Sequence, residues 1–210
     1  MTGTCFAETG HHVICVDNDT DKIARLKQGQ VPIYEPGLEV LIERNTRAHR
    51  LEFSTDLAQA VEKSEIIFLA LPTPPGEDGA ADLRYVLGMA SELGQLIRKY
   101  TLVVNKSTVP VGTGEKVKAV MAEKLPANLF DVVSNPEFLR EGAAVEDFLR
   151  PDRVVIGSDS QKALQLMKEL YDPFVRQGNP IYTMDLRSAE LTKYAANAYL
   201  AVRISFMNEI

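Results

Sequence analysis

The sequence predicts an α/β protein with a doubly wound, mostly parallel sheet that is followed by one long α-helix. Two observations predict this class. Short apolar runs typical of buried strands alternate with helical stretches, and the loops between them are short. The final stretch, residues 185–210, contains no Gly or Pro and is the longest predicted helix. In such a sheet the crossovers are right-handed, and ligands bind beyond the carboxyl ends of the strands.

The strands are predicted from apolar runs that are bounded by turn residues. The run at 66–71 is apolar throughout, as expected for a strand covered on both faces. It leads into a loop at 72–76 that is rich in proline. In chain order, the predicted strands are residues 11–17, 51–53, 66–71, 101–105, 130–133, 153–156 and 181–183.

The helices are predicted from capping residues and from apolar positions that repeat at helical spacing. Asp19 is a cap before one helix and Gly29 ends it, while Ser54 and Asp56 precede another. The last helix has no stop signal, so we expect the chain to end inside it. The predicted helices are residues 2–9, 19–28, 36–45, 57–63, 82–99, 112–125, 160–174 and 185–210.

Composition limits the possible functions. Of the 210 residues, 45% are hydrophobic and 25% are charged, which is typical of a globular protein. The net charge of −6 argues against nucleic-acid and membrane-surface partners. No apolar run approaches the ~18 residues of a membrane span, and because the first residues lack a basic-then-apolar pattern we expect no leader segment. Cys5 and Cys15 are too few for a disulfide framework, so we expect both to be reduced and a cytoplasmic location.

The stretch 135–142 is the first candidate site. It follows the predicted strand 130–133 and carries Glu137, Arg140 and Glu141. Two carboxylates and a guanidinium therefore lie on the loop or first turn beyond the carboxyl end of a strand, where open α/β sheets bind their ligands. A solvated loop with charges at the start of a helix is an equally good explanation of these residues alone.

A second candidate site is a dinucleotide-binding pattern. Such sheets carry G-x-G-x-x-G after the first strand and an acid about 20 residues later, which accepts the ribose hydroxyl. Asp17 suits the acid, although an ordinary turn acid is the alternative, and Gly3 and Ala7 are spaced for close helix–sheet packing. No glycine motif is present, so we expect the first strand and its loop to be missing. Residues 1–183 then form an N-terminally truncated, Rossmann-like dinucleotide-binding domain, and residues 184–210 begin a long helix.

Seven blocks in order along the chain resemble one family, the UDP-glucose/GDP-mannose dehydrogenases. The resemblance covers essentially all of the chain, so chance is a poor explanation. Within the family, the form of residues 108–113 and 147–153 is most similar to the members that act on UDP-glucose. The matching blocks are residues 3–8, 32–38, 71–74, 106–113, 135–142, 151–157 and 190–198.

The resemblance implies an NAD-dependent, two-step oxidation of UDP-glucose to UDP-glucuronate. In the family, a cysteine thiolate adds to the intermediate aldehyde, the thiohemiacetal is oxidised to a thioester, and water releases the acid. The resemblance also implies that this cysteine, its nearby acid and the carboxyl-terminal nucleotide-binding domain lie outside these residues. Cys5 and Cys15 lie in the dinucleotide-binding half and cannot replace the nucleophile.

Four residues match the catalytic groups of the family. Lys193 and Asn197, four residues apart on one helix face, match the donors that stabilise the oxyanion of both hydride transfers. Glu137 matches the carboxylate that assists water in thioester hydrolysis. Thr108 matches a hydroxyl that positions water and cofactor, with a strand-end cap as the alternative.

The same resemblance implies the binding residues, and we expect no metal. An acid at position 17 without a neighbouring arginine favours NAD over NADP. Core packing is the alternative for Phe138 and Leu139. The implied cofactor-binding residues are Asp17, Lys22, Thr73, Thr108 and Glu141, and the implied substrate-binding residues are Glu137, Phe138, Leu139, Arg140, Lys193 and Asn197.

Alternatives to this assignment remain. The chain could be a catalytically inactive fragment that binds nucleotide, or the substrate could be GDP-mannose or a UDP-N-acetylhexosamine. We expect residues 1–210 alone to be unstable or prone to aggregation and to turn over no substrate, because the central strand and the phosphate-binding loop are lacking. In the full-length protein we expect a homodimer through the long helix, on which Tyr194, Ala198 and Val202 are apolar.

Overall fold

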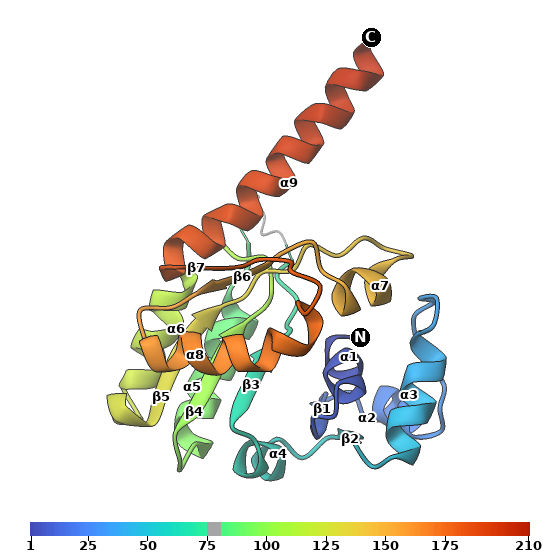
Figure 1. Cartoon of the computed structure of the whole chain (residues 1–210). Helices are drawn as coiled ribbons and strands as arrows, with labels where there is room; N and C mark the ends of the chain where they lie inside the picture. Colours follow the sequence, from blue (N-terminus) through green and yellow to red (C-terminus); the bar gives the residue numbers. More distant parts are fainter. Residues whose placement is uncertain (75–80) are drawn as a thin grey trace. The chain divides into compact units, whose positions relative to one another are not determined.

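A computed structural model describes residues 1–74 and 81–210, and its contacts divide the chain into two compact units (Figure 1). The first unit contains residues 1–63, 138–152 and 172–179, and the second contains residues 64–137, 153–171 and 180–210. The candidate stretch 135–142 is therefore shared between the units. Part of the predicted loop 72–76 lies outside the described residues.

The first unit is built on a pair of parallel strands, in which Val13 of β1 is in register with Leu51 of β2. Apolar side chains from the helices and from β2 form its core, including Ile23, Leu38 and Phe53. Its elements are α1 (Thr2–Glu8), β1 (Val13–Val16), α2 (Thr20–Lys27), α3 (Leu38–Arg47), β2 (Leu51–Ser54), α4 (Leu57–Lys63), α7 (Ala144–Leu149) and the 3-10 turn η2 (Asp172–Phe174).

The second unit contains a five-stranded sheet in the order β3-β4-β5-β6-β7. All neighbours are parallel except β5 and β6, which meet at the single pair Ser134 and Gly157. Helix α8 lies on one face, and α5 and α6 lie on the other (Figure 1). The elements are β3 (Ile66–Leu69), α5 (Arg84–Leu96), β4 (Thr101–Asn105), α6 (Thr113–Ala122), η1 (Ala127–Leu129), β5 (Phe130–Ser134), β6 (Val154–Gly157), α8 (Gln161–Tyr171), β7 (Ile181–Met184) and α9 (Leu186–Glu209).

The predicted α/β class with a mostly parallel sheet and a long final helix is confirmed, with corrections at element ends. The strand predicted at 66–71 ends at Leu69, because Leu71 bonds to a side chain of another loop. The helix predicted at 82–99 covers Arg84–Leu96, and the one at 160–174 ends at Tyr171 and continues as η2. Helix α7 and the 3-10 turn η1 were not predicted from the sequence.

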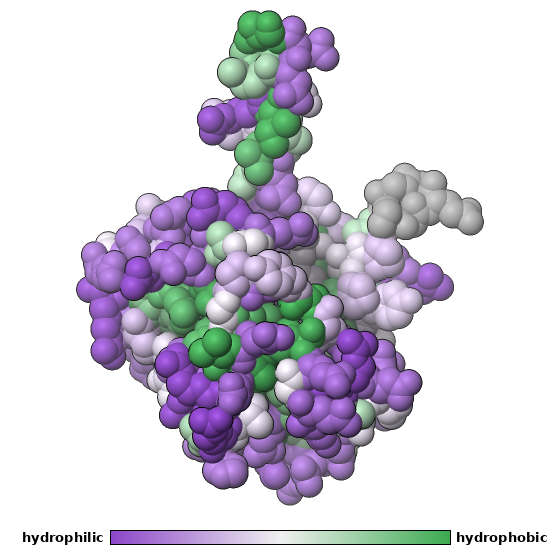
Figure 2. Space-filling model, turned by 90° about the vertical axis from the view of Figure 1, so that its right-hand side faces the viewer, coloured by the Kyte–Doolittle hydropathy of each residue, from purple (hydrophilic) through white to green (hydrophobic). Residues whose placement is uncertain are grey.

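Helix α9 is the longest helix among the described residues. Its start is fixed by Asp185, whose side chain accepts a hydrogen bond of 2.9 Å from the backbone N–H of Ser188. Its first turns are buried against the sheet, whereas its distal part exposes apolar side chains (Figure 2). The exposed large apolar side chains along α9 are Leu191, Tyr194, Tyr199, Leu200, Val202, Ile204, Phe206 and Met207, and the exposed Ile210 follows the helix. Of the helices in the described part of the chain, none combines the length and apolarity needed to cross a membrane.

Candidate functional site

The loops that follow β3 and β4 are joined by side-chain hydrogen bonds. The Thr73 hydroxyl donates to the carbonyl of Thr108 at 3.0 Å. The Ser107 hydroxyl donates to the carbonyl of Leu71 at 2.7 Å and accepts from its N–H at 3.1 Å. Because β3 and β4 are parallel neighbours, both loops leave the sheet at the same edge. The structure thus brings the predicted residues Thr73 and Thr108 together.

The loop after β5 begins at a buried polar network. The side-chain amide of Asn135 donates to the carbonyl of Val155 at 2.8 Å, and its oxygen accepts from the Tyr171 hydroxyl at 2.6 Å. These bonds satisfy a buried amide and fix the start of the loop. The half-buried Glu137 follows two residues later. Asn135 was not predicted to have this role, although an amide directly after an apolar strand is the signal that could have indicated it.

Lys193 and Asn197 lie on α9, where Lys193 is half-buried and Asn197 is exposed. Burial lowers the pKa of Lys193 because the charged form is partly desolvated. The Glu137 carboxylate raises this pKa, whereas the guanidinium of Arg153 lowers it further. Glu137 and Lys193, which are far apart in the sequence, therefore belong to one electrostatic cluster of the second unit.

In the first unit, Asp17 follows β1 and is held in place by local bonds. The Lys22 ammonium donates to one carboxylate oxygen, and the backbone N–H of Asp19 donates to the other at 3.1 Å. The bond from Lys22 is the main cause of the lowered pKa of Asp17, so this carboxylate is ionised at neutral pH. It remains partly exposed. An ionised, accessible acceptor at the end of a strand fits the adenosine ribose of NAD.

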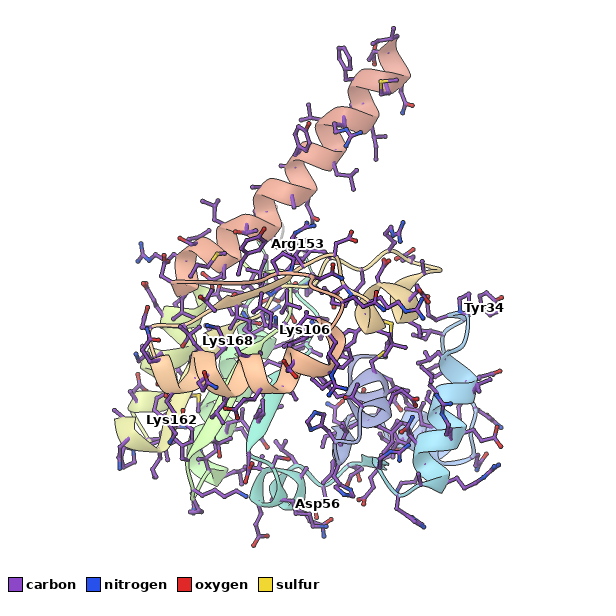
Figure 3. All side chains as sticks on the ribbon, viewed as in Figure 1. Tyr34, Asp56, Lys106, Arg153, Lys162 and Lys168 are labelled. Atoms are coloured by element: carbon purple, nitrogen blue, oxygen red, sulfur yellow. The ribbon has the colours of Figure 1, made fainter. Side chains whose placement is uncertain are left out.

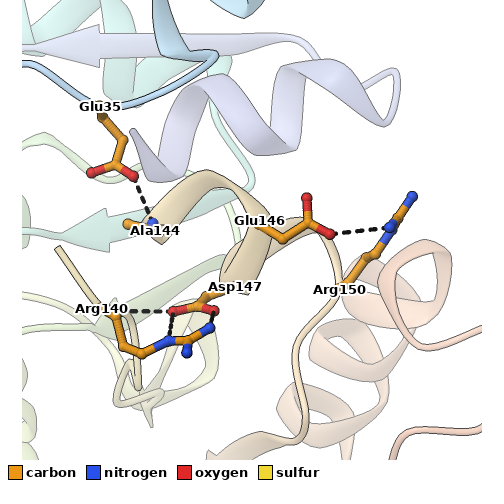
Figure 4. Close-up of polar contacts among 6 residues, drawn as sticks. All are labelled: Glu35, Arg140, Ala144, Glu146, Asp147 and Arg150. Atoms are coloured by element: carbon orange, nitrogen blue, oxygen red, sulfur yellow. Dashed lines mark hydrogen bonds and ion pairs between the residues drawn. The ribbon is translucent and has the colours of Figure 1, made fainter. Parts of the chain in front are cut away.

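The segment 138–144, also in the first unit, is held by two carboxylates (Figure 4). Asp147 accepts two bonds from the Arg140 guanidinium, at 3.0 and 2.6 Å, and one from its backbone N–H at 2.9 Å. Glu35 accepts from the backbone N–H groups of Gly142 and Ala144, at 3.0 and 2.6 Å. Glu35 was not predicted as a site residue, although its place in the matched block 32–38 was a signal for it.

The predicted site residues fall into two groups. Phe138 and Leu139 are half-buried, and Glu141 is exposed. An open depression in the first unit, lined by Lys27, Thr46, His49, Leu51, Glu52 and Phe53, contains none of the predicted residues. The second unit carries Thr73, Thr108, Glu137, Lys193 and Asn197, and the first unit carries Asp17, Lys22, Phe138, Leu139, Arg140 and Glu141.

Comparison with known proteins identifies the family. The model of the UDP-glucose/GDP-mannose dehydrogenase family, NAD binding domain, matches residues 1–175, and that of the central domain matches residues 187–210. The UDP-glucose 6-dehydrogenase of Pseudomonas aeruginosa is 49% identical over 214 residues, which is 100% of this chain and 47% of the relative.

Solved structures agree with this match. A UDP-glucose dehydrogenase from the hyperthermophilic archaeon Pyrobaculum islandicum superposes with a TM-score of 0.93 at 44% identity, over 99% of this chain and 48% of the relative. A GDP-mannose dehydrogenase from Pseudomonas aeruginosa, solved as a ternary complex, superposes with a TM-score of 0.90 at 35% identity. This match covers 99% of this chain and 49% of the relative.

The chain spans about half the length of the curated relatives it matches. The match to the NAD-binding domain confirms the predicted Rossmann-like fold and NAD as the cofactor. The chain therefore belongs to the UDP-glucose/GDP-mannose dehydrogenase family.

Proposed function

We propose that this chain is the amino-terminal portion of an NAD-dependent UDP-glucose 6-dehydrogenase that converts UDP-glucose to UDP-glucuronate. The observation that carries the proposal is the cluster in the second unit, where the carboxylate of Glu137 raises the pKa of the half-buried Lys193. Lys193 shares α9 with Asn197, four residues later, so both side chains lie on one helix face. Hydride transfer from an alcohol requires donors that stabilise its oxygen, and hydrolysis of a thioester requires a base for water; these residues can provide both.

Lys193 and Asn197 donate hydrogen bonds to the substrate oxygen where negative charge develops. Such donors accelerate a reaction most when they are fixed before the reaction and partly shielded from water. The burial that lowers the pKa of Lys193 provides this shielding. Glu137 acts later, as the general base for the water that hydrolyses the thioester, and Thr108 positions that water.

NAD, when bound, accepts the hydride in both oxidation steps. The ionised carboxylate of Asp17 accepts the adenosine ribose hydroxyls, and Lys22 holds that carboxylate in position. Thr73 and Thr108 contact the cofactor from the two joined loops. Glu141, which is exposed, contacts the nicotinamide side in this proposal.

Phe138, Leu139 and Arg140 bind the sugar nucleotide. Glu35 holds the end of their segment, and Asp147 holds Arg140 itself. The choice of UDP-glucose over GDP-mannose follows the order of similarity, because two relatives named as acting on UDP-glucose are 49% and 44% identical and the GDP-mannose dehydrogenase is 35% identical.

We also propose a homodimer, a cytoplasmic location and limits for the two domains. The apolar side chains exposed along distal α9 support a homodimer through this helix. The chain has two cysteines, too few for a disulfide framework, which supports a reducing compartment such as the cytoplasm. We place the NAD-binding domain at residues 1–183 and the start of the central helix at residues 184–210.

The test is NADH production by the complete protein that contains these residues, with UDP-glucose, GDP-mannose and UDP-N-acetylglucosamine compared at equal concentration. We expect turnover with UDP-glucose, and a loss of about 100-fold or more in kcat for Lys193→Ala, as is found when an oxyanion donor is removed. Lys168→Ala is the matched control, because this lysine is exposed on α8 (Figure 3). Absence of turnover with UDP-glucose, or equal activity of Lys193→Ala and wild type, would contradict the proposal.

A further inference from the structure

Glu190 is a buried carboxylate that the proposed reaction does not use. Only 2% of its surface is exposed. Its Oε2 accepts a hydrogen bond from the backbone N–H of Gly112 at 2.6 Å, and its Oε1 accepts from the N–H of Gly114 at 2.7 Å. Burying an ionisable carboxyl group is costly, and these two bonds offset part of that cost. A buried group of this kind needs a structural or functional explanation.

The two bonds attach α9 to the amino-terminal end of α6. The attachment is close, because a Cβ atom added to Gly114 would lie 3.1 Å from Leu186 and 3.3 Å from the Oε1 of Glu190. At this end of α6 the backbone N–H groups have no partner within the helix, and they therefore favour a nearby negative charge. Both oxygens of one side chain therefore join two elements that are more than seventy residues apart in the sequence.

The elements that Glu190 joins carry predicted catalytic residues. Lys193 lies three residues after Glu190 on α9, and Asn197 lies one turn further along. Thr108 lies in the segment between β4 and α6 that ends at Gly112. A shift of α9 along α6 would thus move Lys193 and Asn197 relative to Thr108.

We propose that Glu190 is a positioning residue that holds α9, and with it Lys193 and Asn197, in register with the loop that carries Thr108. This inference rests on the proposed dehydrogenase activity. Arg187 and Glu115 also join α9 to α6, through two bonds of 2.7 Å, but both side chains are exposed to solvent. An exposed ion pair contributes little, so the buried Glu190 contact sets the register.

The first test compares the kinetics of three variants of the complete protein. Glu190→Ala should lower kcat for UDP-glucose about 10- to 100-fold, with KM for UDP-glucose and NAD within about twofold, since misplaced donors weaken the transition state rather than binding. Glu190→Gln keeps one acceptor oxygen, so its kcat should fall less than that of Glu190→Ala. It replaces Glu190→Ala in the comparison if that variant does not fold. Glu115→Ala is the matched control and should retain kcat within about twofold.

The second test is amide hydrogen exchange at residues 112–115, which requires no activity. Glu190→Ala should exchange at least about tenfold faster there than wild type, as expected when a buried bond of ~1.4 kcal/mol is lost. Glu115→Ala should not. An inactive wild-type protein would contradict the proposed function alone. Unchanged exchange in the Glu190 variants, retained kcat, or an equal loss in Glu115→Ala would overturn the positioning role.

Discussion

The hydroxyl of Thr73 donates a hydrogen bond of 3.0 Å to the backbone carbonyl of Thr108. This bond joins the loop after β3 to the loop after β4, beside the paired contacts between Ser107 and Leu71. The acceptor is a main-chain atom, so the bond depends on the side chain of Thr73 and not on that of Thr108. The two threonines can therefore be tested separately.

Thr73→Val should destabilise the protein by about 1 kcal/mol and weaken NAD binding, because it removes the donor of this bond and leaves the carbonyl of Thr108 with one partner fewer. Chemical unfolding and calorimetric titration with NAD measure the two effects. Thr73→Ser keeps the hydroxyl and should behave as wild type. Thr108→Ala keeps the carbonyl, so it should lower kcat without this loss of stability; equal destabilisation by both variants would contradict the assignment.

Asp17→Asn should weaken NAD binding about 10- to 100-fold, the range expected for a charged acceptor of a ribose hydroxyl. The same change should reduce the preference for NAD over NADP, because the carboxylate repels a 2′-phosphate. Titration of the purified protein with both cofactors measures this. Asp21→Asn removes an exposed acid from the first turn of α2, the helix that carries Lys22, and should leave both affinities unchanged. Undiminished NAD affinity in Asp17→Asn would exclude Asp17 from the cofactor site.

The pH dependence of kcat should report Lys193. An ammonium donor is present below its pKa and is lost as the pH rises through it, and burial lowers the pKa of Lys193. Activity should therefore fall on the alkaline side at a lower pH than the ~10.4 of an ordinary lysine.

Glu137→Gln tests whether Lys193 causes the alkaline loss of activity, since the Glu137 carboxylate raises the pKa of Lys193. Without that carboxylate, the alkaline midpoint should move to lower pH, whatever the remaining activity. Arg153→Met removes a positive group that lowers the same pKa, so its midpoint should move the other way. If the alkaline midpoints of the two variants moved in the opposite directions, a group other than Lys193 would control the loss of kcat at high pH.

The sequence predicted the elements because their causes are local. The uniform apolar run at 66–71 and the capping residue Asp19 act within a few neighbours, and both were found near their predicted places. The parts that were missed depend on distant partners. Glu35 and Glu190 bond to backbone N–H groups more than seventy residues away, and nothing in their own neighbourhood specifies this.

The site shows the same distinction between local and distant causes. The i, i+4 spacing predicted that Lys193 and Asn197 share one face of a helix, and the structure confirms that both lie on helix α9. The influence of Glu137 on Lys193 requires the loop after β5 and α9 to be near each other, and periodicity cannot supply that information. The roles of both residues stay predictions until the variants above are measured.

Gly157→Ala should test how closely α9 is seated on the sheet. A Cβ atom at this position of β6 would overlap the Cβ of Ala189 and lie 2.7 Å from the carbonyl oxygen of Asp185, so the backbone of the α9 junction must move. We expect a loss of stability of about 1–3 kcal/mol, as for other overpacked sites, together with a lower kcat because Lys193 moves with the helix. Gly88→Ala is the control, since its added Cβ meets nothing within 4 Å on α5 and should be neutral or stabilising by up to ~1 kcal/mol. Equal stability of the two variants would show that α9 is not held at Gly157.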